Sequence, residues 1–154
     1  KVVDLDAVRD AFVRSDKWIV LCGPVGTGKT SLAVAGYKLL VDRGVYGRFW
    51  NAGELLEAAK ATWGKADAES PLEKLHWRYD LLVLDGLGET RMVDWDRDAL
   101  SRMFGARYNC KLRTVITTNW SPSQFEQELG LWIGDRLNEV ALIVTITGKS
   151  MRGR

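Results

Sequence analysis

A phosphate-binding loop is the feature that most constrains what this chain can fold into. Residues 23–30 read Gly-Pro-Val-Gly-Thr-Gly-Lys-Thr, which completes the pattern G-x-x-x-x-G-K-[ST]. The loop follows an apolar segment, residues 18–22, that is typical of a buried strand. Glycines let backbone amides turn toward phosphate oxygens, and a helix that begins after the loop directs its positive dipole end to the same point. The sequence therefore predicts a nucleoside triphosphate site between a strand and a helix.

The polar residues of the loop have predicted roles at this site. Lys29 is expected to contact the β and γ phosphates of the nucleotide. The hydroxyl of Thr30 has the type and position to bind Mg²⁺, which keeps most of its water and needs only one or two protein oxygens. The predicted nucleotide-binding set is Gly23, Pro24, Val25, Gly26, Thr27, Gly28, Lys29, Thr30 and Ser31.

Length and composition favour a single domain over residues 1–154. With 154 residues, 46% of them hydrophobic, the chain is long enough to bury a substantial core and short for two domains. The net charge of +2 permits an acidic partner without requiring one. No apolar stretch reaches the roughly 20 residues that cross a bilayer, so no membrane association is expected. The first residue is Lys1 rather than Met, which leaves room for a partner-binding segment ahead of it.

The two cysteines give an expectation for the compartment. Cys22 lies in the expected strand before the phosphate loop, and Cys110 follows a helical stretch. Their positions indicate unpaired thiols, which are typical of a reducing compartment. The sequence therefore favours the cytoplasm.

Apolar periodicity and turn residues predict alternating strands and helices. The expected strands are residues 18–22, 47–50, 81–84, 114–118 and 141–146. The expected helices are residues 31–42, 54–61, 71–78 and about 96–108, with two short ones between 122 and 138. This alternation predicts an α/β fold, a five-stranded parallel sheet covered by helices on both faces. Ligands of such sheets bind beyond the carboxyl ends of the strands, where the phosphate loop, Asp85 and Asn119 fall.

Asp85 is the predicted second ligand of the metal. It follows four apolar residues, as in the second nucleotide-binding motif, whose carboxylate holds Mg²⁺ directly or through water; the alternative is an acid that caps a turn. Hydrolytic proteins of this class place a second acid next to it to orient the attacking water, but here that position is Gly86. The nearest substitute is Glu89, in a flexible turn that contains Gly86 and Gly88. The alternative for Glu89 is a solvated loop acid.

Asn119 ends the expected strand that lies between those of the phosphate loop and Asp85. A carboxamide there can bond the γ phosphate or the attacking water, and the alternative is an Asn that forms a turn. Asp85 to Gly88 also fits the D-x-x-G motif of regulatory GTPases. Their guanine-specifying Asn-Lys-x-Asp motif has no counterpart here, because Trp120 follows Asn119. Guanine specificity is therefore not predicted.

Together these motifs resemble those of the AAA+ ATPases, and among them the DnaC-like helicase loaders and the IstB-like transposition ATPases. The resemblance spans most of the chain. Besides the phosphate loop and the Asp85 motif, it rests on Ala106-Arg-Tyr108 leading into Val115–Asn119, on Gly134-Asp-Arg136-Leu137 and on Gly148-Lys-Ser150-Met-Arg152.

The resemblance implies a P-loop NTPase of the AAA+ type, a three-layer sandwich without a C-terminal helical lid, that binds ATP with Mg²⁺ and hydrolyses it. By the same resemblance, Asn119 is sensor 1, Arg136 is an arginine finger presented to the ATP of a neighbouring subunit, and Arg152 is a sensor 2 candidate. A planar, permanently charged guanidinium suits a polyphosphate. An arginine that acts in trans implies a homo-oligomer. Gly86 departs from the family pattern and predicts weak hydrolysis.

The resemblance to helicase loaders also implies macromolecular partners, a replicative helicase and single-stranded DNA. It places the DNA contacts in the helical insertion before Asp85, at Lys60, Lys65, Lys74 and Arg78, and the alternative for these residues is a solvated basic face. The chain has seven tryptophans, which can stack on bases, although core or partner contacts are the simpler role for most. His76 has no cysteine or carboxylate cluster at metal-ligand spacing, so zinc binding is not expected.

Four functions remain open on this evidence. The leading expectation is an ATP-dependent helicase loader in DNA replication that assembles with copies of itself on single-stranded DNA. An ATP-dependent helper of a DNA transposase fits the same motifs. A nucleotide-gated switch with little hydrolysis follows from Gly86. A small-molecule P-loop kinase is least favoured, because nothing resembles an arginine-rich acceptor lid.

Overall fold

A sheet of five parallel strands forms the centre of the molecule in the computed structural model, which describes residues 4–148. The strands are β1 (Trp18–Cys22), β2 (Gly47–Asn51), β3 (Leu81–Leu87), β4 (Arg113–Thr118) and β5 (Ala141–Thr145). Their order across the sheet is β2-β3-β4-β1-β5. The predicted α/β architecture is confirmed, and β4 lies between β1 and β3 as expected.

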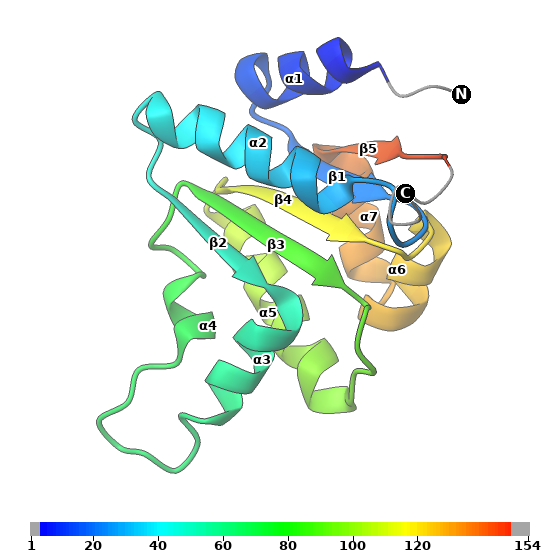
Figure 1. Cartoon of the computed structure of the whole chain (residues 1–154). Helices are drawn as coiled ribbons and strands as arrows, with labels where there is room; N and C mark the ends of the chain where they lie inside the picture. Colours follow the sequence, from blue (N-terminus) through cyan, green and yellow to red (C-terminus); the bar gives the residue numbers. More distant parts are fainter. Residues whose placement is uncertain (1–3, 149–154) are drawn as a thin grey trace.

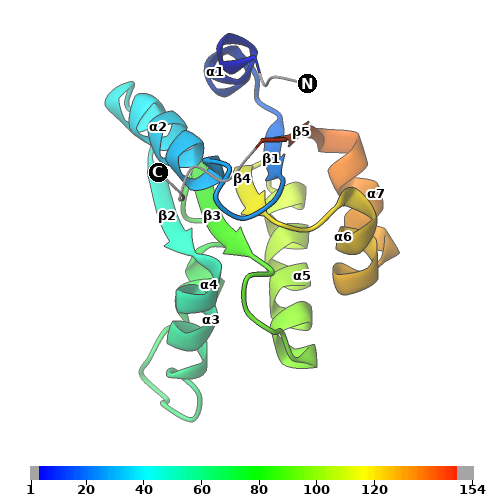
Figure 2. The same cartoon turned by 45° about the vertical axis from the view of Figure 1, so that its right-hand side comes forward.

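Helices cover both faces of the sheet and complete three layers (Figure 1). One face carries α1 (Leu5–Arg14) and α2 (Lys29–Asp42). The other carries α3 (Ala52–Lys60), α4 (Pro71–Lys74), α5 (Asp94–Asn109), α6 (Pro122–Leu129) and α7 (Leu131–Val140). Figure 2 shows α2 and the group α5 to α7 on opposite sides of the strands. No helix among residues 4–148 is long and apolar enough to cross a bilayer.

Each central strand buries both of its faces. In β1, Ile19 and Leu21 pack toward α1 and α2, while Trp18, Val20 and Cys22 pack toward the helices of the opposite face. All five side chains of β1 are buried. A strand buried on both faces reads as a continuous apolar run, which is why the sequence revealed it.

The first helix, α1, was not among the predicted elements. The side chain of Asp4 caps it by accepting hydrogen bonds from the amides of Asp6 and Ala7. Val8 and Phe12, one turn apart, are its buried residues. The capping acid and this spacing were the available signals, but a single pair of apolar residues is weak evidence for a helix.

Arg107 on α5 explains why α4 ends at Lys74 rather than continuing to residue 78 as predicted. Its fully buried guanidinium donates to the carbonyl oxygens of Leu75 at 2.7 Å, Tyr79 at 3.0 Å and Arg113 at 2.9 Å, and to the hydroxyl of Thr114 at 2.9 Å. These bonds hold the segment between α4 and β3 in an irregular path. Burial lowers the pKa of Arg107 to about 10, and the charges of Cys110 and Asp80 act in the opposite direction.

Candidate nucleotide site

The phosphate loop leaves the carboxyl end of β1 and enters α2 directly. Its glycines at 23, 26 and 28 all have positive φ angles. The Nζ of Lys29, which is only 7% exposed, donates to the carbonyl oxygens of Gly23 at 2.7 Å and Pro24 at 2.6 Å. The Thr27 hydroxyl donates to the Pro24 carbonyl at 2.9 Å. The ammonium group therefore lies inside the loop, among backbone groups that the loop turns inward.

A pocket of about 190 Å³ opens at this loop. It is lined by Val25, Gly26, Gly28, Lys29, Thr30, Ser31 and Glu89. Six of these seven residues belong to the nucleotide-binding set predicted from the sequence, and the seventh is the predicted substitute acid. Polar and cationic groups beside the N-terminus of α2 suit an anionic ligand.

The two motifs predicted to hold the metal are in direct contact through Thr30, which lines this pocket. The Thr30 hydroxyl donates to Oδ1 of Asp85 at 2.9 Å and lies 3.2 Å from its Oδ2. Hydroxyl and carboxylate oxygens are ligands that Mg²⁺ prefers, so this pair of side chains fits that ion. Thr30 and Asp85 are 55 positions apart in the chain, so the sequence alone does not indicate that they are in contact.

Thr117 on β4 is a member of this constellation that the sequence did not reveal. Its hydroxyl donates to Oδ1 of Asp85 at 2.6 Å and accepts a hydrogen bond from the Gly86 amide at 2.8 Å. It is 1% exposed. A threonine in a strand rich in β-branched residues is ordinarily expected to serve packing. Only the pairing of β4 with β3 shows that Thr117 contacts Asp85 and Gly86.

The strand β3 continues beyond Asp85, which corrects the prediction that this acid ends it. The register against β4 shifts between Leu84 and Leu87, forming a β-bulge in which residues 85 and 86 face Thr117. Gly86 takes the left-handed conformation there, with φ of +75°. Leu87 is fully buried, so the segment that the sequence suggested was flexible begins as part of the sheet.

Beyond the bulge, the chain turns back toward the pocket. The Glu89 amide donates to the Gly86 carbonyl at 3.2 Å and closes a turn over residues 86–89. Gly88 permits a close approach of Trp120, because a Cβ at position 88 would lie 2.3 Å from the indole nitrogen. The turn is thereby packed against the residue that follows Asn119.

The other predicted site residues fall in different places. Asn119 is exposed and comes directly after β4, at the same edge of the sheet as Asp85. Arg136 lies on α7, where it donates to the hydroxyl of Tyr108 at 3.0 Å and to Glu139 at 3.3 Å. Its guanidinium carbon is 4.7 Å from the centre of the Tyr108 ring and 5.5 Å from that of Trp132. Arg152 lies outside the described residues.

Cys22 borders the phosphate loop as the last residue of β1. Burial raises the pKa of its thiol to about 11, and the nearby charge of Lys29 lowers it in part. Cys22 is buried and Cys110 exposed, and both are free thiols, as the sequence indicated.

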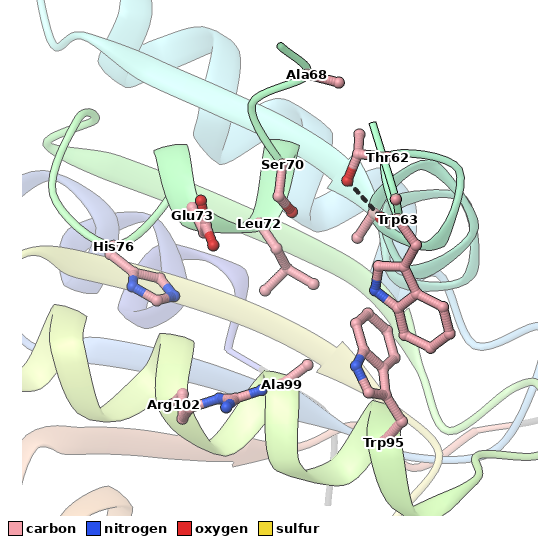
Figure 3. Close-up of a pocket in the computed structure, with 12 residues that line it drawn as sticks. Thr62, Trp63, Ala68, Ser70, Leu72, Glu73, His76, Trp95, Ala99 and Arg102 are labelled. Carbon is pink, nitrogen blue, oxygen red and sulfur yellow. Dashed lines mark hydrogen bonds between the residues drawn. The ribbon is translucent and has the colours of Figure 1, made fainter. Parts of the chain in front are cut away.

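The helical insertion predicted to contact DNA contains a separate cleft of about 470 Å³ between α3, α4 and α5. Figure 3 shows Trp63 and Trp95 at one end of this cleft and His76 at the other. The two indole rings meet edge to face with centres 4.8 Å apart. Burial lowers the pKa of His76, Arg102 and Arg107 lower it further, and Glu73 opposes them.

Lys60 in this insertion has a structural contact that the sequence did not indicate. Its Nζ lies 2.9 Å from Oδ1 of Asp96, whose side chain is 5% exposed, and 5.6 Å from the centre of the Trp95 ring. This ion pair joins the end of α3 to the start of α5. Lys74 pairs with Glu69 at 3.5 Å. Lys65 and Arg78 are exposed.

The five-stranded sheet and the phosphate loop define a P-loop nucleotide-binding protein with the AAA+ fold. The whole chain, residues 1–154, matches the family described as IstB-like ATP binding protein. The chain belongs to this family.

Its curated relatives include proteins of bacterial insertion sequences. The IS232 putative ATP-binding protein of Bacillus thuringiensis subsp. berliner is 30% identical over 96% of the chain and 60% of that relative. The IS21 putative ATP-binding protein of Pseudomonas aeruginosa is also 30% identical, over 97% of the chain and 59% of that relative. The chain thus spans about 60% of the length of these relatives.

Solved structures agree with the fold. A crystal structure of the DnaC helicase loader superposes with a TM-score of 0.82 and 27% identity, covering 92% of this chain and 86% of that one. AMPPCP-bound DnaA from Aquifex aeolicus superposes with a TM-score of 0.77 at 19% identity, covering 96% of this chain and 47% of that one. The second likeness supports the fold alone.

Proposed function

We propose that this chain is the ATP-binding module of a protein that assists the transposition of an insertion sequence, and that it hydrolyses ATP with Mg²⁺. The contact between Thr30 and Asp85 carries the nucleotide part, because it joins the second motif to the phosphate loop, next to the pocket that Lys29 and Thr30 line. The family match and the insertion-sequence relatives support the transposition part. They favour the transposase helper over the helicase loader that led the expectations from sequence.

In this proposal the loop residues bind the phosphates. Lys29 exchanges its backbone carbonyl acceptors for oxygens of the β and γ phosphates, and the loop amides surround them. Thr30 and Asp85 hold Mg²⁺, which neutralises charge on the phosphates during transfer. Asn119, at the end of β4, contacts the γ phosphate or the attacking water.

Arg136 acts on a neighbouring subunit in this proposal. Arg136 contacts Tyr108, Trp132 and Glu139 on α5 and α7, whereas the phosphate loop leads into α2 on the opposite face. A guanidinium that contacts two aromatic rings has a restricted direction, which suits a residue that must meet a polyphosphate on another chain. An ATP-dependent homo-oligomer follows from this assignment.

A DNA contact surface completes the proposal. Trp63 is 58% and Trp77 is 65% exposed, and the exposed cations Lys65 and Arg78 belong to the same insertion. Aromatic and cationic groups together bind single strands by stacking and by contacts with phosphate. Lys60 is not assigned to DNA, because it neutralises the buried Asp96.

Helicase loading in DNA replication is the second candidate. The TM-score of 0.82 with the DnaC helicase loader favours it. In that function the protein partner would be a replicative helicase and the DNA would be single-stranded.

The test measures ATP hydrolysis by the full-length protein with and without single-stranded and duplex DNA, together with binding of a fluorescent ATP analogue. Lys29→Ala should abolish binding of the analogue, whereas Lys38→Ala, an exposed lysine of the same helix, should leave binding unchanged. Absence of binding by the unmodified protein would refute the nucleotide site. Co-precipitation with a transposase or with a replicative helicase then separates the two candidates.

A further inference from the structure

We propose that Glu89 is the catalytic acid–base residue of this site. It takes the role that hydrolytic proteins of this class give to an acid directly after the metal-binding Asp, a position that Gly86 occupies here. The inference rests on the proposed hydrolysis of ATP. It assigns to one side chain the task of orienting the attacking water and accepting its proton.

The bulge in β3 explains why the acid is not at position 86. A φ of +75° favours glycine and strains any larger residue. A Cβ at this position would also lie 2.8 Å from Oε2 of Glu89 and 3.4 Å from Nδ2 of Asn51. The Glu89 carboxylate therefore lies over the backbone of Gly86, in the space that a side chain at 86 would enter.

The turn that carries Glu89 is anchored to the sheet. The Gly86 amide donates to Thr117, and the Thr118 hydroxyl donates to the Leu87 carbonyl at 2.7 Å. The Glu89 amide closes the turn onto Gly86 at 3.2 Å. Because β4 fixes the start of the turn, the backbone that carries Glu89 has a defined position relative to Asp85.

Glu89 also lines the pocket at the phosphate loop. The same pocket is lined by Lys29 and Thr30. Asp85 already accepts hydrogen bonds from the hydroxyls of Thr30 and Thr117. A separate carboxylate near the γ phosphate is then available for the water.

The reaction step is balanced with these groups alone. The water oxygen forms a bond to the γ phosphorus. At the same time the bond from the γ phosphorus to the oxygen that bridges it to the β phosphate breaks, and the electron pair of that bond leaves with ADP. One water proton passes to the Glu89 carboxylate, which then releases it to inorganic phosphate or solvent. Thr30, Asp85 and the loop stay unchanged through the cycle.

Glu89→Gln tests the assignment, since it keeps the size of the side chain and removes its basicity. We expect turnover of ATP to fall on the order of 100-fold, as for loss of a general base. Affinity for the fluorescent ATP analogue should stay unchanged, which also shows that the variant is folded. Glu54→Gln, at an exposed glutamate of the neighbouring helix α3, should leave both quantities unchanged.

Turnover that survives Glu89→Gln would overturn the assignment and leave the proposed ATPase intact. An unmodified protein that binds ATP but hydrolyses none, even with DNA and its partner, would overturn it in favour of a nucleotide-gated switch. Absence of ATP binding would instead refute the proposed function.

Discussion

Thr117 shows how one hydroxyl can organise a site at the residue scale. It donates to Asp85 and accepts from Gly86, so it orients a carboxylate and satisfies a buried amide at the bulge. The sequence predicted Asp85 and Thr30 because their motifs are local. It could not predict Thr117, because its role depends on which residues of β3 and β4 face each other. Likewise, Glu89 was a candidate from sequence, but its position over Gly86 depends on the bulge.

Replacing Thr117 with valine tests this role. Valine keeps the shape but leaves the Gly86 amide without its acceptor, so we expect the free energy of unfolding to fall by about 1–3 kcal/mol. ATP turnover should also fall, because Asp85 loses the donor that orients it. Urea denaturation and a phosphate-release assay measure the two effects. Thr117→Ser keeps the hydroxyl and is the control; equal stability of the two variants would contradict the role.

The two thiols should react at different rates. Thiolate is the nucleophile, and burial raises the pKa of Cys22 to about 11, so at pH 8 this residue is protonated as well as inaccessible. Cys110 is exposed. Titration of the native protein with a thiol reagent should therefore show one fast group, and Cys110→Ser should remove it. Fast reaction of both thiols would show that β1 opens at its end.

At the scale of elements, the sequence predicted the strands and helices that apolar periodicity and turn residues indicate. The strands β1 and β3 were found because each is a short apolar run, β4 because it is rich in β-branched residues, and α2 because Gly44 follows its end. The prediction was wrong where side chains from distant elements decide the backbone path. The helix at residues 71–78 was overextended because Arg107, on α5, bonds the carbonyls that follow Lys74. The continuation of β3 beyond Asp85 was missed because a bulge has no periodic signature.

Arg107→Met should be strongly destabilising. Methionine fills part of the space but cannot donate to the carbonyls of Leu75, Tyr79 and Arg113, which remain buried. We expect the free energy of unfolding to fall by about 3 kcal/mol or more, since several acceptors lose a donor together. Chemical denaturation measures the loss. Arg102→Met, at an exposed arginine on the same helix, should change stability little; equal losses would refute the bridging role.

At the scale of the whole molecule, the phosphate loop and Arg136 belong to opposite layers. The loop leads directly into α2. Arg136 lies on α7, where it contacts Tyr108, Trp132 and Glu139. The sequence indicated Arg136 through its family resemblance, but not the aromatic residues around it. Their grouping arises from the packing of α5 against α7, which no local pattern contains.

A mixing experiment tests the action of Arg136 in trans. Lys29→Ala and Arg136→Ala should each abolish ATP turnover alone. In an equal mixture, about a quarter of the contacts between neighbours would pair an intact loop with an intact arginine, so part of the activity should return. Phosphate release from the mixture measures it. A mixture no more active than its components would indicate that Arg136 has no role across subunits.

The packing of Trp120 against Gly88 has an optical consequence. Indole emission responds to the polarity around the ring, and this indole borders the turn that carries Glu89. The difference between the emission spectra of the unmodified protein and of Trp120→Phe isolates its signal from those of the other tryptophans. The molecule therefore contains its own fluorophore beside the turn that carries Glu89, and rearrangements there can be followed in real time without a chemical label.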